Sequence, residues 1–386
     1  MRILIAFFLV IAPVASAAQI LVDAGRGPVT VEVPSSYDPA KPLPLVVGLH
    51  GYTNTGADFE NYFQLAPFAE SEGFFYANPT GTTDLFGNPF WNGTNACCNL
   101  FGSGVNDVAY LLALIDEIRS QLNVDPWRIH FTGYSNGAFM SFRMSCDHAD
   151  LVASMAGQSG VSYLNPLDCQ PSGPLHTLQI HGTSDETISY TGGTVPLGGS
   201  YPAAEQTVAD WAGYNGCDAT PNTSLASLDL DSGIVGAEST RIEYLEECSP
   251  GGSSRLWTVP GGAHRISQSS VYKQRLVQFL LQHRKAGLFF SDKTTLQWPT
   301  LYGAADYRVY RGNLSDLFDT DADGLAENGY GDCQTSTVAS SYVDATIPTA
   351  GSGFFYLIGF QDGAGVDSML GTVSSGGARL PATSCP

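Results

Sequence analysis

The chain has few basic residues for its size. Its 386 residues include 17 lysines and arginines against 37 aspartates and glutamates, which gives a formal net charge of -20 at pH 7. A surface with this charge repels the phosphates of nucleic acids and the headgroups of anionic membranes. The shortage of cations therefore argues against a nucleic-acid partner and favours a neutral or weakly charged one.

Long apolar runs are scarce as well. Only the first segment is markedly apolar: Arg2 precedes an apolar run from Ile3 to Val14, and Ala15-Ser16-Ala17 follows. This combination is typical of a secretory signal with a small-residue cleavage site. Nothing later approaches the roughly 18 uninterrupted apolar residues of a membrane helix. We predict a signal peptide over residues 1–17, no membrane span, and an exported soluble protein, extracellular or periplasmic.

The C-x-x-C pattern of zinc sites is absent from the eight cysteines. An even number of cysteines in an exported chain favours disulfides. We predict bridges between Cys217 and Cys248 and between Cys333 and Cys385. The other four are Cys97, Cys98, Cys146 and Cys169. Because strain disfavours a bond between neighbours, we expect one of the adjacent pair to reach Cys146 and the other Cys169, in an order that the sequence leaves open.

The most informative motif is the pentapeptide Gly133-Tyr134-Ser135-Asn136-Gly137. An apolar, strand-like run over residues 128–132 precedes it, and a helix-compatible stretch without proline over residues 138–144 follows it. This is the pattern of a nucleophile elbow, a sharp strand-to-helix turn that exposes a serine hydroxyl. The flanking glycines leave room where strand and helix pass close together. We predict that Ser135 is a nucleophile.

A carboxylate and a histidine follow in the chain, each just past a strand-like segment. Asp185 comes after the segment over residues 175–180, and His264 after the segment over residues 255–259. The order serine, aspartate, histidine is the one that α/β-hydrolases use. We predict His264 as the general base and Asp185 as the acid that orients it. Four of the other six histidines are expected to be structural because they lie within strand or helix patterns, namely His130, His148, His176 and His283. His181, like His50, sits before a glycine at a strand end.

The chain divides into two parts by pattern. Up to about residue 288, strand patterns alternate with helical ones, which predicts a mainly parallel sheet flanked by helices. Short strands separated by glycine, aspartate and serine follow, which predicts a small all-β sandwich over residues 293–386. The catalytic domain is then expected over residues 18–288.

The second part contains Asp319-Thr320-Asp321-Ala322-Asp323-Gly324, the start of a calcium-loop pattern. Alternating carboxylates suit a hard cation, and the glycine permits the turn. The twelfth position holds Tyr330 instead of the bidentate glutamate. We therefore weigh a structural calcium on Asp319, Asp321 and Asp323 against a solvated acidic loop, and predict no cofactor for catalysis.

Over residues 25 to 285 the chain resembles secreted esterases of carbohydrate esterase family one, of the polyhydroxybutyrate depolymerase-like and feruloyl esterase-like kind. The motifs that carry the resemblance are Pro42 to Gly51, Trp91-Asn92-Gly93 with Cys97-Cys98, Asn106-Asp107-Val108, Gly133 to Gly137, His181 to Asp185 and Gly261 to His264. The resemblance implies an α/β-hydrolase fold with Ser135, Asp185 and His264 as the triad. The C-terminal part is similar to fibronectin type III-like modules.

The same resemblance implies further roles at the site. His50-Gly51-Tyr52 resembles the turn that supplies the first oxyanion donor, so the expected donors are the backbone N–H groups of Tyr52 and Asn136, while His50 is structural. A disulfide-tied loop is expected to place Trp91 near the acyl pocket, and Tyr134 is a second candidate for substrate contact.

Three functions remain in competition at this point. The first is hydrolysis of hydroxycinnamoyl (feruloyl) esters of plant polysaccharide through an acyl-enzyme. The second is depolymerisation of an extracellular polyester of the polyhydroxybutyrate type, and the third is polysaccharide binding without catalysis. The sequence pattern favours a serine carboxylic ester hydrolase with an ester substrate, small or polymeric, and we expect a monomer.

Overall fold

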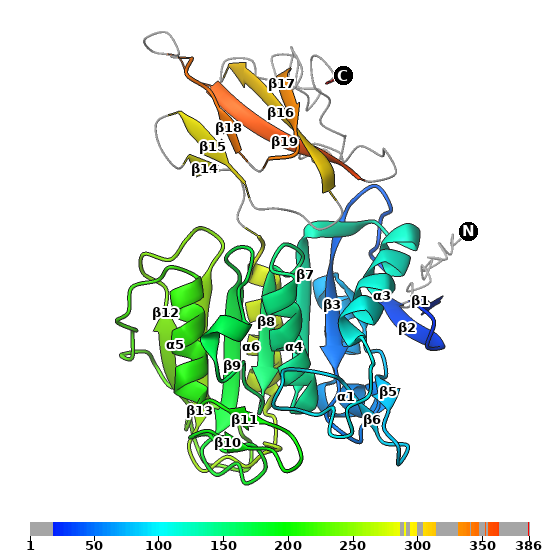
Figure 1. Cartoon of the computed structure of the whole chain (residues 1–386), viewed down its shortest axis with the longest axis vertical. Coiled ribbons are helices and arrows are strands. Elements are labelled where there is room, and N and C mark those ends of the chain that lie inside the picture. The colour runs from blue at the N-terminus through cyan, green and yellow to red at the C-terminus, as the bar shows by residue number, and fades with distance from the viewer. Residues whose placement is uncertain are drawn as a thin grey trace, which may run out of the picture.

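A computed structural model describes residues 18–285, 289–290, 294–298, 304–313, 331–339, 341–346, 352, 354–362 and 385. Its main body is a nine-stranded sheet (Figure 1). The strands in spatial order are β1 (Ala18–Asp23), β2 (Pro28–Val33), β4 (Phe75–Ala77), β3 (Leu43–Leu49), β7 (Val124–Tyr134), β8 (Ser154–Gln158), β9 (His176–Gly182), β13 (Ser253–Val259) and β12 (Thr240–Tyr244).

The centre of this sheet is parallel. Strands β4, β3, β7, β8, β9 and β13 form five successive parallel pairs. The pairs β1–β2, β2–β4 and β12–β13 are antiparallel. The parallel strands are buried on both faces, which explains their continuous apolar runs. The arrangement is the α/β-hydrolase fold that the sequence predicts, and it brings the carboxyl ends of the parallel strands to one edge.

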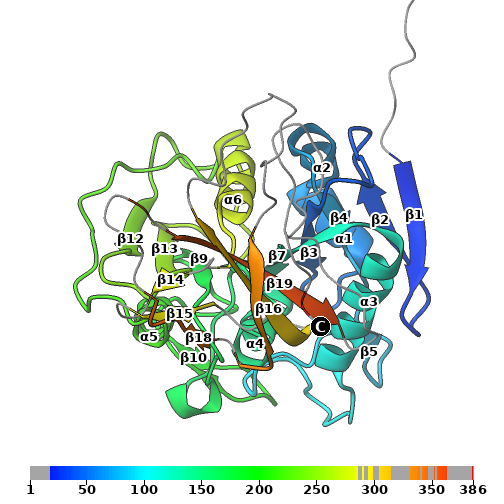
Figure 2. The same cartoon turned by 90° about the horizontal axis from the view of Figure 1, so that it is seen from above.

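Among the described residues, six helices cover the two faces of the sheet: α1 (Gly56–Phe63), α2 (Ala66–Glu72), α3 (Asp107–Gln121), α4 (Asn136–Asp147), α5 (Ala204–Tyr214) and α6 (Ser270–Gln282). The core under one face includes residues of α3, α4 and α5, and the core under the other includes residues of α1, α2 and α6 (Figure 2). Helix α3 illustrates why these helices pack on the sheet. Its apolar residues recur at helical spacing and form one buried face, namely Val108, Leu111, Ile115 and Ile118.

Short elements fill the connections on the catalytic part. They are the paired strands β5 (Thr82–Thr83) and β6 (Pro89–Phe90), the paired strands β10 (Gly193–Thr194) and β11 (Ser200–Tyr201), and a 3-10 turn over Pro166–Asp168.

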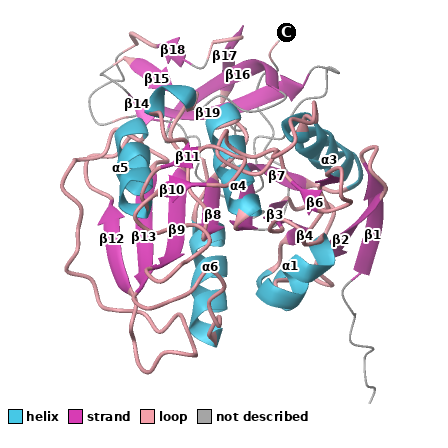
Figure 3. Ribbon diagram, turned by 60° about the horizontal axis from the view of Figure 1, so that its bottom comes forward, coloured by secondary structure: helices cyan, strands magenta, loops and turns pink. Residues whose placement is uncertain are grey.

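The described residues of the C-terminal part form two small antiparallel sheets (Figure 3). One contains β14 (Phe289–Phe290), β15 (Thr295–Gln297) and β18 (Ser341–Val343), and the other contains β17 (Asp332–Thr337), β16 (Ala304–Asn313) and β19 (Phe354–Asp362). The predicted strands of this part are confirmed within these bounds. The fibronectin type III-like identity stays a prediction. The calcium candidates Asp319, Asp321 and Asp323, and the predicted signal peptide, lie outside the described residues.

One aromatic side chain of the catalytic part packs on the C-terminal sheets. Leu296, Trp298, Tyr307, Val309 and Phe360 form their shared core, and Trp127 near the start of β7 contacts it. Since β7 enters the sheet at this end, the C-terminal sheets lie at the opposite end of β7 from Ser135 (Figure 1).

Disulfides close four loops, and one part of the predicted pairing is wrong. Cys217–Cys248 and Cys333–Cys385 form as predicted. Cys146 bonds to Cys169, and Cys97 bonds to its neighbour Cys98. Cys146 lies in α4 and Cys169 directly follows the 3-10 turn, with 5.1 Å between their Cα atoms, a normal bridging distance. Cys146 and Cys169 therefore pair with each other, and Cys97 and Cys98 form the remaining disulfide.

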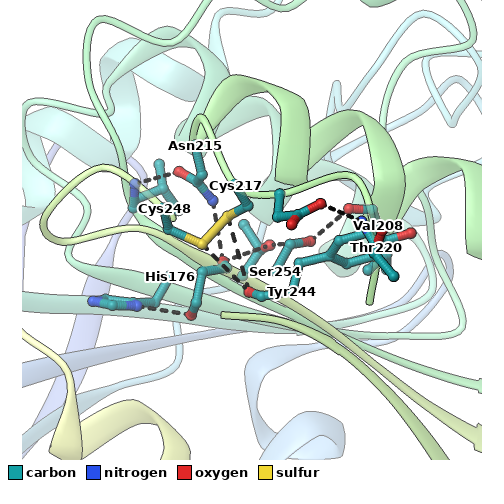
Figure 4. Close-up of a disulfide and its surroundings, with 12 residues drawn as sticks. His176, Val208, Asn215, Cys217, Thr220, Tyr244, Cys248 and Ser254 are labelled. Atoms are coloured by element: carbon teal, nitrogen blue, oxygen red, sulfur yellow. Dashed lines mark hydrogen bonds between the residues drawn. A yellow bond between two sulfur atoms is a disulfide. The ribbon is translucent and has the colours of Figure 1, made fainter. Parts of the chain in front are cut away.

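The Cys217–Cys248 bridge shows how one loop is anchored (Figure 4). Asn215, at the end of α5, accepts a hydrogen bond from Leu175 N at 3.0 Å and donates one to Ser253 O at 3.1 Å. Its carbonyl accepts from Ser249 N at 2.8 Å. The disulfide and this amide together hold the loop after β12 against the amino ends of β9 and β13.

In the described part of the chain, no helix is both long and apolar enough to pass through a lipid bilayer.

Candidate active site

Ser135 sits in a strained turn at the carboxyl end of β7. Its φ of 54° and ψ of -118° lie in a region of backbone conformation where residues other than glycine are rarely found. Strand β7 ends at Tyr134 and α4 begins at Asn136, so the turn between them is one residue long. The Ser135 N–H donates to Gln158 O at 2.8 Å, which fixes the turn against β8.

The two flanking glycines are required by close backbone contacts. A Cβ at Gly133 would lie 2.2 Å from Gly137 O, and a Cβ at Gly137 would lie 2.0 Å from Leu49 O. Neither contact can be relieved by a side-chain rotation, because both partners are backbone atoms. The G-x-S-x-G pattern is thus a consequence of how tightly α4 crosses β7 and β3.

Ser135, His264 and Asp185 meet at this edge of the sheet. His264 Nε2 lies 2.9 Å from Ser135 Oγ, and His264 Nδ1 lies 2.8 Å from Asp185 Oδ2. The His264 side chain is 18% exposed and that of Asp185 is 0% exposed. The serine hydroxyl and the carboxylate therefore contact opposite nitrogens of one imidazole.

Asp185 is held as an anion by several donors. Its Oδ1 accepts from the N–H groups of Thr187 and Ile188 at 2.9 and 2.8 Å. Its Oδ2 accepts from His264 and lies 3.2 Å from His181 Nε2. Burial alone would raise the pKa of Asp185, but the hydrogen bonds from His181 and His264 outweigh it and hold the pKa well below its ordinary value.

The two histidines that precede glycines at strand ends are buried and hydrogen-bonded on both ring nitrogens. His50 Nε2 accepts from Gly81 N at 2.9 Å, so its Nδ1 carries the proton and donates to Gly51 O at 2.7 Å. Burial lowers the pKa of His50 to about 4. His181 Nδ1 accepts from Gln179 at 3.1 Å, and its Nε2 donates to Ile188 O at 2.8 Å. The position of His50 fits the structural role predicted for it.

Of the two expected oxyanion donors, Asn136 directly follows Ser135 and is the first residue of α4. Among the described residues, no atom accepts a hydrogen bond from the backbone N–H of Tyr52 or of Asn136. The Asn136 side chain is engaged elsewhere: its amide accepts from Trp91 N at 2.7 Å and donates to Trp91 O at 2.8 Å. The backbone of Asn136 is thereby fixed at the first turn of α4.

The structure corrects one predicted substrate contact. The Trp91 side chain is 0% exposed and belongs to the hydrophobic core. Its ring lies between those of His50 and Tyr110, with centroids 5.1 and 6.4 Å away. Because its backbone is bonded to Asn136 and its ring is enclosed, Trp91 supports the turn and does not face a ligand.

Tyr134, the other predicted contact, is only partly buried. Its ring centroid lies 5.2 Å from that of His264 and 5.3 Å from that of Tyr62. Burial raises the pKa of Tyr134 to about 12, so the phenol is neutral. Tyr62, Tyr134 and Arg265 are among the residues that line a small depression beside His264, and the Arg265 guanidinium lies 4.3 Å from the centre of the Tyr62 ring.

Two polar residues at this edge were not predicted from the sequence. Gln158 ends the buried strand β8 and Ser159 directly follows it. Gln158 contacts Ser135, and Ser159 contacts the loop that carries His264. Their position at a strand end, next to the end of β7, was the available signal. In the part of the chain described by the structure, no group of three or more histidine, cysteine, aspartate or glutamate side chains is placed to hold a metal ion.

Comparisons with known proteins find relatives among esterases. No protein-family model matches the chain. Feruloyl esterase B of Piromyces equi is 28% identical over 260 residues, which cover 66% of this chain and 45% of that protein. Poly(3-hydroxyalkanoate) depolymerase C of Paucimonas lemoignei is 27% identical over 215 residues, 47% of each chain. The chain is a homologue of esterases with the α/β-hydrolase fold.

The aligned region spans less than half of the length of these two curated relatives. Among solved structures, an acetyl xylan esterase from Aspergillus awamori matches with a TM-score of 0.47 and 18% identity, over 68% of this chain and 99% of that one.

Proposed function

We propose that this chain is an exported serine esterase that hydrolyses carboxylic esters through an acyl-enzyme on Ser135. The observation that carries the proposal is the continuous hydrogen-bonded line from Ser135 Oγ through the His264 imidazole to Asp185. The similarity to named esterases over most of the catalytic part supports the same chemistry. Four disulfides support an oxidising compartment and therefore export.

The proposed roles are those of a serine hydrolase triad. His264 Nε2 takes the Ser135 proton as Oγ attacks the ester carbonyl, and then gives it to the leaving alcohol. Asp185 holds the Nδ1–H tautomer and stabilises the imidazolium that forms. The N–H groups of Tyr52 and Asn136 donate to the developing oxyanion, a contact typically worth about two to three orders of magnitude in rate per donor. In the second half of the reaction, water takes the place of the Ser135 hydroxyl, attacks the acyl-enzyme by the same proton transfers and releases the acid.

For the substrate we propose a hydroxycinnamoyl ester of a polysaccharide, with Tyr134 contacting the substrate. The similarity to the feruloyl esterase covers 66% of the chain, against 47% for the depolymerase. The second candidate is an aliphatic polyester, which the similarity to a poly(3-hydroxyalkanoate) depolymerase favours.

The test is hydrolysis of methyl ferulate, feruloylated arabinoxylan, short p-nitrophenyl esters and polyhydroxybutyrate by wild type and Ser135→Ala. We expect turnover of methyl ferulate that disappears in the variant. Faster release from polyhydroxybutyrate than from either feruloyl ester would select the second candidate. A folded wild type that turns over none of these esters would contradict the esterase proposal and favour a binding protein.

A further inference from the structure

We propose that Gln158 and Ser159 are positioning residues that clamp the loop carrying His264 to the turn carrying Ser135. The loop, residues 260–269, connects β13 to α6 and is called the His264 loop below. The inference rests on the proposed function in so far as it concerns catalysis. It assigns a role to a buried polar cluster that the triad mechanism does not use.

The clamp is attached to the nucleophile turn through the backbone. Gln158 is the last residue of β8, and its carbonyl accepts the Ser135 N–H at 2.8 Å. Ser159 N donates to Ile180 O of β9 at 2.9 Å. Ser159 has a φ of 55°, in the left-handed region that a serine seldom occupies. The chain therefore leaves β8 by a fixed path that directs the Ser159 side chain toward the His264 loop.

Three contacts join this segment to the His264 loop. Ser159 Oγ donates directly to His264 O at 2.7 Å. Gln158 Oε1 accepts from Gln268 Nε2 at 2.9 Å. Gln158 Nε2 donates to the Tyr62 hydroxyl at 2.9 Å, and that hydroxyl donates to Ile266 O at 2.7 Å. The loop is held at every second residue from 264 to 268.

The same glutamine also reaches α6. The Tyr272 hydroxyl donates to Gln158 Oε1 at 2.8 Å. Gln158 is 1% exposed and Tyr272 is 0% exposed, so these groups have no access to bulk water. A glutamine at the end of a buried strand carries a desolvation cost that an apolar residue would avoid. Its amide is stabilised because both ends of it are hydrogen-bonded to the surroundings of His264.

Catalysis is sensitive to this arrangement because proton transfer from Ser135 to His264 depends on their 2.9 Å separation. A displacement of about 1 Å at a reacting group can lower the rate about 100-fold. The outer side of the His264 loop is held separately, since Ser232 N donates to Ser267 O at 2.8 Å. Loss of the clamp is therefore expected to loosen the loop without unfolding it.

The experiment compares Gln158→Met and Ser159→Ala with Thr177→Val. Thr177 is 2% exposed in β9 and hydrogen-bonds to Ser253 O and Ser254 Oγ, far along the strand from the site. The Thr177→Val variant loses buried hydrogen bonds of the same kind, so it controls for a general loss of stability. Two readouts are needed: kcat and KM with the best ester substrate, and amide hydrogen exchange of peptides from the His264 loop.

We expect kcat to fall about 10- to 100-fold in Gln158→Met, and less in Ser159→Ala, with KM within about twofold of wild type. Exchange in the His264 loop should rise in both variants and stay unchanged in Thr177→Val. Equal exchange in all four proteins, or an equal fall of kcat in Thr177→Val, would overturn the clamp. The exchange readout needs no substrate, so it tests the clamp even where an inactive wild type has already contradicted the esterase proposal.

Discussion

His264, at the carboxyl end of the parallel sheet, and a histidine cluster at its amino end have different surroundings. At the carboxyl end, His264 is partly exposed and lies between a hydroxyl and a carboxylate. Near the amino ends of β8 and β9, His130 and His283 are buried and His176 is partly buried, and the rings of His176 and His283 stack with centroids 3.9 Å apart. Residue type alone therefore does not distinguish a base from a core histidine. The neighbouring groups and the exposure of the side chain to solvent distinguish the two.

The buried cluster is kept neutral by its surroundings. Burial, followed by nearby cationic groups, lowers the pKa of His176 to about 2 and that of His283 to about 4. His130 shifts in the same direction for the same first cause. The ring nitrogens bond to Ser154 Oγ, Ser253 Oγ and Phe279 O. These histidines serve packing and hydrogen bonding, and no step of the proposed mechanism involves them.

The largest contrast between the two ends is expected from a matched pair of substitutions. His264→Gln removes the base, so kcat/KM for an ester should fall about 10⁴-fold or more while the melting temperature changes little. His176→Gln should leave the activity per folded molecule unchanged and destabilise the fold by about 1–3 kcal/mol, because it disrupts buried stacking and a bond to Ser253. Esterase kinetics and thermal unfolding measure both. Loss of activity in folded His176→Gln would contradict the division.

The next largest effect concerns the carboxylate. Asp185→Asn keeps an oxygen for the N–H groups of Thr187 and Ile188 but places an amide where Oδ2 accepts from His264. The Nδ1–H tautomer of His264 then loses its partner, and kcat should fall about 10⁴-fold with the fold intact. Steady-state kinetics alongside circular dichroism check this. An activity within tenfold of wild type would show that Asp185 does not orient the base.

The smallest effect is the response of stability to acid. The pKa of His283 is lowered in the folded state, so the unfolded chain binds a proton near its ordinary value of 6.5 while the folded chain does not. Stability is thus fully present above pH 6.5 and is lost as the pH falls toward 4. The loss for this site alone is about 2–3 kcal/mol by pH 4.5. His50 and His176 act in the same direction.

Urea unfolding of wild type and His283→Gln at pH 7 and pH 4.5 isolates this contribution from that of the carboxylates. The wild type should lose more free energy of unfolding between the two values than the variant does. An identical loss in both proteins would mean that His283 is protonated in the folded state, contrary to its burial.

The sequence allowed the fold and the three central side chains to be predicted because their signals are local. The elbow is written in five consecutive residues, and Asp185 and His264 each directly follow an apolar strand run. Parallel strands then bring their carboxyl ends to a common edge without further information. Ser135, Asp185 and His264 meet there although 129 positions separate Ser135 from His264.

What escaped the sequence depends on contacts between distant segments. The partners of Gln158 lie 96, 110 and 114 positions away, and no local pattern indicates that three such hydroxyl and amide groups converge on one glutamine. The same holds for the pairing of Cys146 with Cys169, which left Cys97 and Cys98 to each other. Trp91 was misassigned because its enclosure by His50 and Tyr110 is a property of packing.

The most direct test of the account is covalent titration with a fluorophosphonate, which phosphonylates only an activated serine. Wild type should take up one phosphonyl group per chain, and peptide mass spectrometry should place it on Ser135. Ser135→Ala should take up none, and His264→Gln should react far more slowly. Labelling of another residue, or no labelling of a folded wild type, would contradict the claim that Ser135, His264 and Asp185 form a working nucleophile.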